Sequence, residues 1–359
     1  MNKEYSIQLL EKLCNAKGAP GFEDEVVAIV EEESKNFGPQ NQDSMLNFYV
    51  HRKENTGNKP LVQLDSHTDE VAFVIQAIKP NGTLQFITAG SWTPHNIPAH
   101  KVYVRNKFGK YIPGIVASTP PHFMSEADRN KPLTLSALSI DIGACSREEA
   151  INSFGIRIGE PAVPAVEFSY DKEHDLMLAK AFDNRLGVAA TIDTMRALEN
   201  ENLNVDVVCT FSTQEEVGCR GAKLSANTVQ ADVAIVFEGC PADDTTIVPD
   251  YLIQTALKKG PMLRHIDISM VTNPRWQRFA LDTAAEFDIP VQEAVRSGGG
   301  TNGSAIHISG KGVPCIVIGM PVRYAHTHYC YASYEDYQNA VKLAVALIKK
   351  LNKEIVETF

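Results

Sequence analysis

The sequence predicts an α/β fold, with a mixed, largely parallel sheet flanked by helices and an inserted small β-barrel domain. From Lys180 onward, helical patterns alternate with the β-branched runs VDVVCTF, DVAIVF and PCIVIG, which is typical of parallel strands covered by helices. From about Val71 to Phe168, short alternating runs such as LQFIT and KVYVRN are separated by NG, FGK and several prolines. That second pattern is typical of a small antiparallel β domain.

The α/β domain is expected to be split along the chain. The run LVQLDS at 61–66 has the character of the later strands rather than that of the segment that follows it. A length of 359 residues also favours two domains over a single core. We therefore expect an α/β domain made of residues 1–70 and 166–359, and a β domain made of residues 71–165.

Helices are expected at both ends of the chain. Two amphipathic patterns, roughly Glu4–Ala16 and Glu23–Asn36, are separated by a break rich in glycine and proline. Asn273 followed by Pro274 is typical of a helix N-terminus. The last helical pattern places a row of apolar side chains on one face: Ala340, Leu343, Ala344, Leu347, Ile348 and Leu351.

Composition excludes several classes of protein. The chain is 44% hydrophobic and 22% charged and has no apolar run of about 18 residues, so neither a membrane span nor disorder is expected. A net charge of -10 weighs against nucleic acid as a partner. Seven cysteines without a CxxC pair and a start without a signal-peptide cleavage site favour a reducing compartment. We therefore expect a cytoplasmic protein with neither nucleic-acid nor membrane partners.

Acidic and imidazole side chains follow four apolar strands. They are His67, Asp69 and Glu70 after LVQLDS, Glu215 and Glu216 after VDVVCTFS, Glu238 after VAIVF, and His326 and His328 after PCIVIG. Strand carboxyl ends in an open α/β sheet face the ligand crevice, so these side chains could meet there. Asp183 precedes a further helical pattern, where it could cap the helix or join the cluster. One imidazole per ion, a shared carboxylate and terminal carboxylates would make a two-metal site.

Each of these residues also has a plain structural interpretation. A single histidine after a strand is more often a hydrogen-bonding residue than a ligand, and the pair Glu215-Glu216 is more often a solvated loop. The coincidence of all of them favours a metal site. Neighbours in an extended chain point to opposite sides, so a turn must aim one glutamate at a metal and leave the other free as a base. His328 is an alternative to His326, because an extended HTH would aim both rings the same way.

Two further features are expected to be structural. The run Gly298–Gly300 is not followed by GK[ST], so it predicts a turn into a helix rather than a phosphate site. Four cysteines lie near the proposed site in the sequence, but none forms a thiol-protease motif with a histidine. They are therefore predicted to be buried and to take no part in the chemistry: Cys209, Cys219, Cys240 and Cys330.

Several motifs resemble metallopeptidase family 42, the glutamyl and tetrahedral (TET) aminopeptidases, also known as cellulase M. The similar segments span nearly the whole chain: HTDE at 67–70, GIVASTPPHFM at 114–124, SIDIGACSREEA at 139–150, KAFDNRLG at 180–187, TQEEVGCRGA at 213–222 and VRYAH at 322–326. The resemblance implies a zinc-peptidase-like domain and a β domain used for subunit contacts. It also implies a homo-oligomer built from dimers, for which a twelve-subunit shell is one expected form.

The resemblance further implies roles for seven residues. One metal would be held by His67, Asp183 and Glu238, and the other by Asp183, Glu216 and His326, with Asp183 bridging. Glu215 would be the general base, and Asp69 would orient His67. The match to RYxH favours His326 over His328. Two departures from the family pattern are Glu238, where aspartate is commoner, and TNG at 301–303, where TDA is usual.

The predicted function is a metal-dependent aminopeptidase that removes N-terminal residues from short peptides. It would use two divalent ions per subunit, zinc or cobalt with manganese also acceptable. One alternative is a hydrolase of other amide, acylated or sugar substrates, although glycosidases need two opposed carboxyls rather than a histidine-bearing metal cluster. Another is a peptide-binding or assembly protein in which the TNG loop has disabled catalysis.

Overall fold

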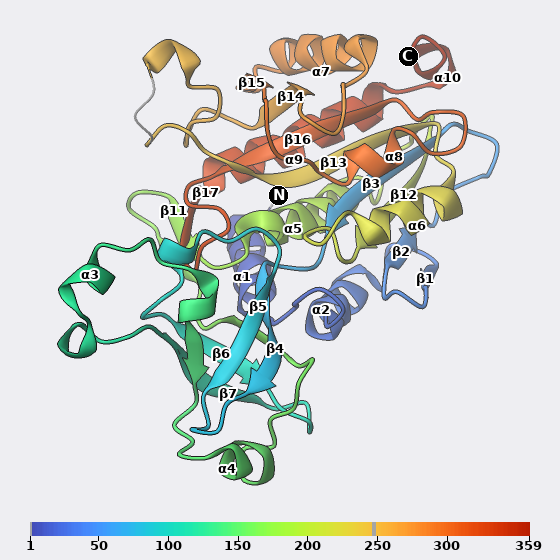
Figure 1. Ribbon diagram of the computed structural model, residues 1–359. Helices are drawn as coiled ribbons and strands as arrows, with labels where there is room; N and C mark the ends of the chain where they lie inside the picture. Colours follow the sequence, from blue (N-terminus) through green and yellow to red (C-terminus); the bar gives the residue numbers. More distant parts are fainter. Residues whose placement is uncertain (1, 246–248) are drawn as a thin grey trace.

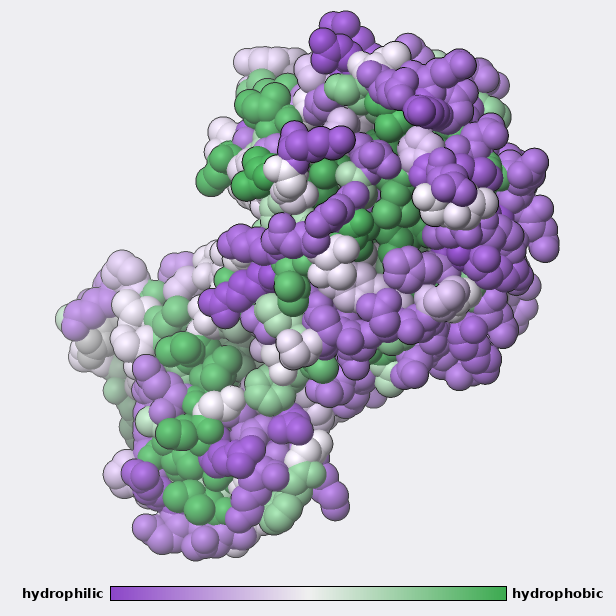
Figure 2. Space-filling view, turned by 90° about the vertical axis from the view of Figure 1, so that its right-hand side faces the viewer, coloured by the Kyte–Doolittle hydropathy of each residue, from purple (hydrophilic) through white to green (hydrophobic). Residues whose placement is uncertain are grey.

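The computed structural model describes residues 2–245 and 249–359, which form a larger and a smaller lobe (Figures 1 and 2). The larger lobe is built on an eight-stranded sheet. Its strands, in spatial order, are β1 (Gln40–Gln42), β2 (Phe48–His51), β12 (Asp206–Ser212), β3 (Leu61–His67), β13 (Val233–Pro241), β16 (Cys315–Val322), β14 (Met262–Ile266) and β15 (Gln292–Val295). The central strands β12, β3, β13 and β16 are parallel, whereas β2 and β14 pair with their central neighbours antiparallel. The mixed, largely parallel sheet is therefore confirmed.

Helices cover both faces of this sheet (Figure 1). The helices of the α/β lobe are α1 (Lys3–Asn15), α2 (Asp24–Ser34), α5 (Phe182–Ala197), α6 (Arg220–Val229), α7 (Pro274–Glu286), α8 (Gly303–Ile306), α9 (Tyr334–Lys350), α10 (Lys353–Val356) and the 3-10 turn η4 (Asp250–Leu252). Alternate side chains of β13 enter two different cores. Ile235 and Phe237 pack in the larger core with α5 and α9, while Ala234 and Val236 pack in the smaller core with α6 and α8.

The helices expected at the chain ends are confirmed. The side chain of Asn273 accepts hydrogen bonds from the backbone N–H groups of Arg275 and Trp276, so it caps α7 as its position before Pro274 predicts. The apolar face of α9 is fully inside the larger core: Ala340, Leu343, Ala344, Leu347 and Ile348. None of the helices within the described ranges has the length and apolarity needed to cross a bilayer.

The smaller lobe is a closed antiparallel barrel that follows β3 directly. Its strands, in spatial order, are β4 (Ala72–Ile78), β5 (Leu84–Ala89), β8 (Ser139–Asp141), β7 (Tyr111–Ala117), β6 (Lys101–Arg105) and β9 (Pro161–Pro164). Short helices lie in its connections: η1 (Pro94–Asn96), η2 (Pro121–Phe123), α3 (Glu126–Arg129), η3 (Leu135–Ala137) and α4 (Arg147–Asn152). The barrel has its own buried core, which includes Phe73, Phe86 and Val104. The expected small β-barrel is thus present.

A three-stranded sheet lies beside the junction of the two lobes. It consists of β10 (Ser169–Asp171), β11 (Leu176–Ala179) and β17 (Cys330–Ser333), all antiparallel. β11 leads into α5, and the loop before β17 contains His326 and His328. This small sheet therefore fixes two segments that border the carboxyl ends of the central strands.

Candidate metal and active site

The carboxyl ends of the central strands bring the candidate residues together. His67 is the last residue of β3, Glu238 lies in the second half of β13, and Glu215 and Glu216 follow β12 by a short turn. The loop after β16 adds His326, and the start of α5 adds Asp183. Five candidate ligands that are far apart in the sequence therefore lie in one cluster: His67, Asp183, Glu216, Glu238 and His326.

Asp183 lies between two groups of possible ligands. Its Oδ1 is 3.0 Å from His67 Nε2, and the same imidazole nitrogen is 3.2 Å from Glu238 Oε1. Its Oδ2 is 3.2 Å from His326 Nε2, which is also 3.4 Å from Glu216 Oε2. Each carboxylate oxygen of Asp183 thus faces a separate imidazole and a separate glutamate.

The backbone around Asp183 is shaped to bring it close to β13. Asp183 itself has non-helical backbone angles, and Asn184, rather than Asp183, supplies the side chain that accepts from the N–H of Gly187. A Cβ added at Gly239 would lie 2.7 Å from the Cα of Asp183 and 2.6 Å from the carbonyl oxygen of Phe182. The approach of β13 to this turn therefore requires glycine at position 239.

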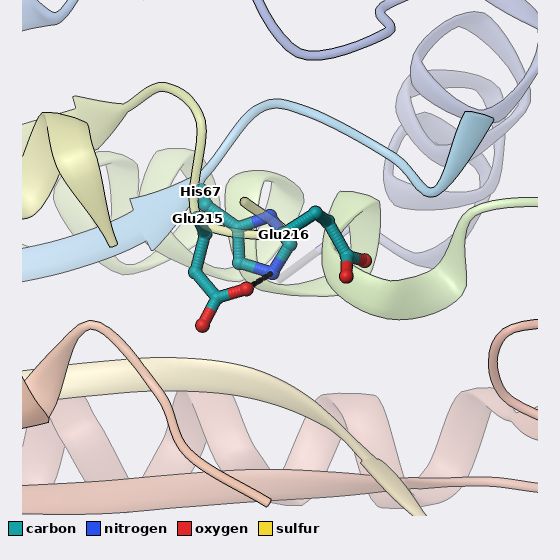
Figure 3. Close-up of side chains that lie close together, drawn as sticks. All are labelled: His67, Glu215 and Glu216. Atoms are coloured by element: carbon teal, nitrogen blue, oxygen red, sulfur yellow. Dashed lines mark ion pairs between the residues drawn. The ribbon is translucent and has the colours of Figure 1, made fainter. Parts of the chain in front are cut away.

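A turn stabilised by Asp69 presents Glu215 and Glu216 to the cluster. Gln214 has a left-handed φ of 55°, which redirects the chain after β12. Asp69 accepts hydrogen bonds from the N–H groups of Glu215, at 2.9 Å, and Glu216, at 3.1 Å, and its Oδ1 is 3.4 Å from His67 Nδ1. Figure 3 shows the two glutamate side chains diverging on either side of the His67 ring, with Glu215 Oε2 4.0 Å from Nε2.

Burial and mutual charge shift the pKa values of the whole cluster. Burial raises the pKa of Glu216 and Glu238 well above the ordinary value, and it also raises that of Glu215. Burial lowers the pKa of His326, but Asp183 and Glu216 outweigh it and raise the value to about 10. For His67, burial likewise lowers the pKa, and the charge of Glu238 and hydrogen bonding to Asp183 raise it well above 6.5. Because these raised pKa values all favour bound protons, the centre of the cluster favours positive charge.

The donor atoms of this cluster fit divalent cations. Among the described residues, three buried carboxylate oxygens have no hydrogen-bond partner, and two of them, Glu216 Oε1 and Glu238 Oε2, belong to this cluster; the third is Glu23 Oε2. Such orphaned acceptors are costly to bury unless a cation or proton satisfies them. Imidazole nitrogens together with carboxylate oxygens are the ligand types of hydrolytic zinc and cobalt centres.

His328 lies away from the cluster. His326 adopts a left-handed φ of 60°, so the HTH segment is not extended and the two rings point in different directions. The expectation that both rings would be aimed the same way is wrong. The His328 ring is buried and stacks on His100, with ring centroids 4.3 Å apart, next to Trp92.

The cluster opens into a chamber of about 550 Å³. Four of the candidate ligands, Asp183, Glu216, Glu238 and His326, line its wall. Arg264, Arg296 and the glycine run 298–300 line it as well. Neither arginine could be identified from the sequence, because each stands on or after a short strand without a motif around it. The expected turn into a helix after the glycine run is present, with α8 starting at Gly303.

The expectation that Cys219 is buried and takes no part in the site is wrong. It is partly exposed, and its thiol donates a hydrogen bond to Glu215 Oε1 over 3.3 Å. Cys240 is buried in the chamber wall, where its Sγ accepts from Arg264. Cys209 and Cys330 are buried as expected.

In the TNG segment, where the family usually has TDA, the middle residue contacts a second polar residue in the core. Asn302 is fully buried, and its Nδ2 donates a hydrogen bond to Asp65 Oδ1 over 2.7 Å. The other oxygen of Asp65 accepts from Ser212 and Thr210. An aspartate at position 302 would therefore face a second buried carboxylate, and asparagine removes that conflict.

Comparisons with known proteins agree with this architecture. The profile of the M42 glutamyl aminopeptidase family matches residues 47–343. The lysyl aminopeptidase of Pyrococcus furiosus is 30% identical over 355 residues, which cover 96% of this chain and 97% of that protein. The TET aminopeptidase of Thaumarchaeota archaeon SCGC AB-539-E09 superposes with a TM-score of 0.95 at 34% identity, over 100% of this chain and 99% of that one.

A further solved structure is relevant to assembly. The TET1 peptidase of Pyrococcus horikoshii, which can assemble into a tetrahedron or a large octahedral shell, superposes with a TM-score of 0.85 at 28% identity. The alignment covers 96% of this chain and 100% of that one. The family profile includes every candidate ligand from His67 to His326, and the likenesses extend over nearly the entire chain, barrel included. The resemblance predicted from the motifs is thus confirmed, and the chain belongs to the M42 family of aminopeptidases.

Proposed function

We propose that this aminopeptidase uses two divalent metal ions to remove the first residue of short peptides. The observation that carries the proposal is the position of Asp183, whose two carboxylate oxygens face separate His/Glu groups. His67, Asp183 and Glu238 would hold one ion, and Asp183, Glu216 and His326 the other. When bound, such ions lower the pKa of water toward about 7 and polarise a carbonyl group.

Glu215 is the general base of the proposed reaction. Its carboxylate lies 4.0 Å from His67 Nε2, at the edge of the cluster and in the chamber wall. Burial raises its pKa, which suits a group that takes a proton from the attacking water and passes it to the leaving amine. Asp69 is the positioning residue for this step, because it holds the N–H groups of both Glu215 and Glu216.

A substitution at Glu215 distinguishes a role as general base from a role as metal ligand. Glu215→Gln keeps the backbone N–H that Asp69 binds, so we expect both metals by elemental analysis and a loss of turnover of about 10²-fold or more. Glu11→Gln, on the exposed side of α1, is the matched control. Another possible ligand group is His67, Glu215 and Glu216. Loss of one metal in E215Q would make Glu215 a ligand, and substantial turnover in E215Q would remove it from catalysis.

A substrate panel distinguishes aminopeptidase chemistry from other hydrolytic chemistry. We expect cleavage of aminoacyl p-nitroanilides that is abolished by a chelator, and no cleavage of N-acyl amino acids or cellulose. Assays with zinc, cobalt and manganese added back to the chelated protein would identify the supporting metal. The seven free thiols support a reducing compartment such as the cytoplasm.

The barrel is proposed to form contacts between subunits. Several apolar side chains are exposed on it, including Ile87, Ile115 and Phe123, and Figure 2 shows apolar residues gathered on the smaller lobe. Exposed apolar patches of this kind are typical of interaction sites. The shells and the dodecamer formed by the TET1 peptidase support a homo-oligomer built from dimers, for which a dodecamer is one expected form. Light scattering would test this, and a stable monomer at working concentration would contradict it.

A further inference from the structure

The loop that carries His326 lies against the barrel. This ligand loop, residues 323–329, connects β16 to β17, and Figure 1 shows β17 beside the smaller lobe. The loop turns twice through left-handed backbone, with a φ of 62° at Tyr324 and of 60° at His326. Bulky residues adopt this conformation uncommonly, and the contacts around them usually hold it. The direction of the His326 ring therefore depends on what the ligand loop contacts.

The first contact is a hydrogen bond from the ring of His326 to the smaller lobe. Its Nδ1 lies 3.0 Å from the carbonyl oxygen of Ser91, which follows β5. A carbonyl can only accept, so Nδ1 carries a proton, and Nε2 is the nitrogen that faces Asp183 and Glu216. Histidines that bind metals commonly donate their second ring N–H to such an acceptor, which fixes the tautomer and the ring orientation. A backbone group of the smaller lobe thus orients one candidate ligand.

The second contact is made by the ring of His328, two residues further along the ligand loop. This buried ring stacks on His100, with the ring centroids 4.3 Å apart and an angle of 16° between the planes. Its centroid is 5.2 Å from that of Trp92 and 6.2 Å from that of Phe73. The three partners come from separate segments of the smaller lobe, directly before β6, between β5 and η1, and on β4. His328 therefore anchors the ligand loop to the barrel.

The same part of the smaller lobe is adjacent to a second candidate ligand. Gly90 directly precedes Ser91 and has a φ of 84°. A Cβ added at Gly90 would lie 2.6 Å from Val71 Cγ1 and 3.2 Å from Glu216 Oε2. The segment after β5 therefore borders both Glu216 and His326, which belong to the same proposed ion site.

We infer that the barrel positions the candidate ligand His326, through the stack of His328 on His100 and the carbonyl group of Ser91. The stack seats the ligand loop on the barrel, and the carbonyl then sets the direction of the His326 ring. The inference rests on the proposed function, since it concerns one of the two proposed metal sites. It makes His328 a positioning residue rather than a ligand, and it gives the barrel a role besides subunit contacts.

This role concerns one of the two proposed ions. His67 pairs with Ser212 and Glu238 pairs with Gly319 in the eight-stranded sheet, so the ladder places these two ligands without the ligand loop. We therefore expect loss of the stack to weaken the ion that His326 would hold and to spare the other.

A double-variant cycle across the stack tests the inference. H100A removes the ring on the barrel side, and H328A removes it on the loop side. Metal-free protein is titrated with Co(II), and visible absorption and elemental analysis follow the two ions. Each variant should need about tenfold more Co(II) to fill the weakened site. The double variant should lose no more than the single variants, because both changes remove the same contact. Unchanged affinities in both single variants, or losses that add in the double variant, would overturn the inference.

Two further variants separate positioning from general destabilisation. H328F keeps a planar ring in the stack, so it should bind both ions as the unmodified protein does. A site weakened as much in H328F as in H328A would also contradict the inference. H122A, on the exposed surface of η2 in the same lobe, is the matched control and should leave both affinities unchanged. If H328A does not fold, H100A carries the test, because His100 is only partly buried.

Hydrogen exchange separates this inference from the proposed reaction, because it needs neither metal nor turnover. In the metal-free protein, the backbone amides of residues 323–329 should exchange about tenfold faster in H100A than in the unmodified protein. An unmodified protein that binds fewer than two ions but shows this difference would retain the anchoring of the loop and refute the two-metal site. One that binds two ions, with exchange and Co(II) affinity unchanged in H100A, would retain the proposed function and refute the anchoring.

Discussion

Asn302 donates a hydrogen bond from its side-chain amide, over 2.7 Å, to the buried carboxylate of Asp65 on β3, the strand that ends in the candidate ligand His67. The two residues come from opposite ends of the chain and are both fully buried. The contact gives a structural reason for asparagine in the TNG segment. It also predicts how the two positions should respond to substitution.

N302D should destabilise the protein, because it places two carboxylates against each other in the core. We expect a loss of about 2–4 kcal/mol in the free energy of unfolding, measured by urea denaturation. The swap D65N/N302D restores one amide and one carboxylate, so it should recover much of that loss. A swap no more stable than N302D alone would show that Thr210 and Ser212 require the carboxylate at position 65.

Asp69→Ala should lower turnover through the turn that it stabilises. Without its carboxylate, the N–H groups of Glu215 and Glu216 lose their acceptor and His67 loses a neighbouring charge. The expected effect is a fall of about 10–100-fold in kcat or in metal affinity, measured by steady-state kinetics and metal titration. D282N, on the exposed side of α7, is the control. An unaltered kcat in D69A would mean that the turn holds its shape without Asp69.

Gly239→Ala should weaken metal binding although it replaces none of the candidate ligands. The new methyl group would collide with the backbone of Phe182 and Asp183, so β13 and the start of α5 must move apart. Gly298→Ala is a matched control, because a Cβ there meets no atom within 4 Å. We expect G239A to need on the order of tenfold more metal for half-saturation in a calorimetric titration. Equal affinities for G239A and G298A would contradict a rigid approach of these segments.

Asp336 should make stability depend on pH. Burial raises its pKa to about 6, although its oxygens accept from the N–H groups of Lys258 and Gly260. Because the folded pKa lies above the unfolded value, this contribution to stability is complete below the unfolded pKa and is lost as pH rises through about 6.

D336N removes that titration and so isolates it. The stability of the unmodified protein relative to D336N should fall by on the order of 1 kcal/mol between about pH 5 and about pH 8. Denaturation at the two pH values gives the difference. A constant difference, or one that grows with pH, would show that Asp336 does not titrate as its burial predicts.

Much of the fold and the cluster could be predicted because strand ends are visible in the sequence. The runs that became β3, β12, β13 and β16 each lead into an acidic or imidazole side chain, and parallel strands bring such ends to one edge. The ring directions of His326 and His328 could not be predicted, because they depend on a left-handed residue that is not glycine. Arg264 and Arg296 were missed for another reason, since only the antiparallel addition of β14 to β16 brings them to the chamber.

The interruption of the α/β lobe by the barrel has a consequence for synthesis on the ribosome. His67 is synthesised directly before the whole barrel, whereas His326 is synthesised after the barrel and after β13 and β16. A barrel with its own core can fold while the sheet is still missing β13 and β16. In the proposed two-metal arrangement, both metal sites could therefore be filled only after His326 has been synthesised, so a chain that stops within or soon after the barrel would lack a complete site.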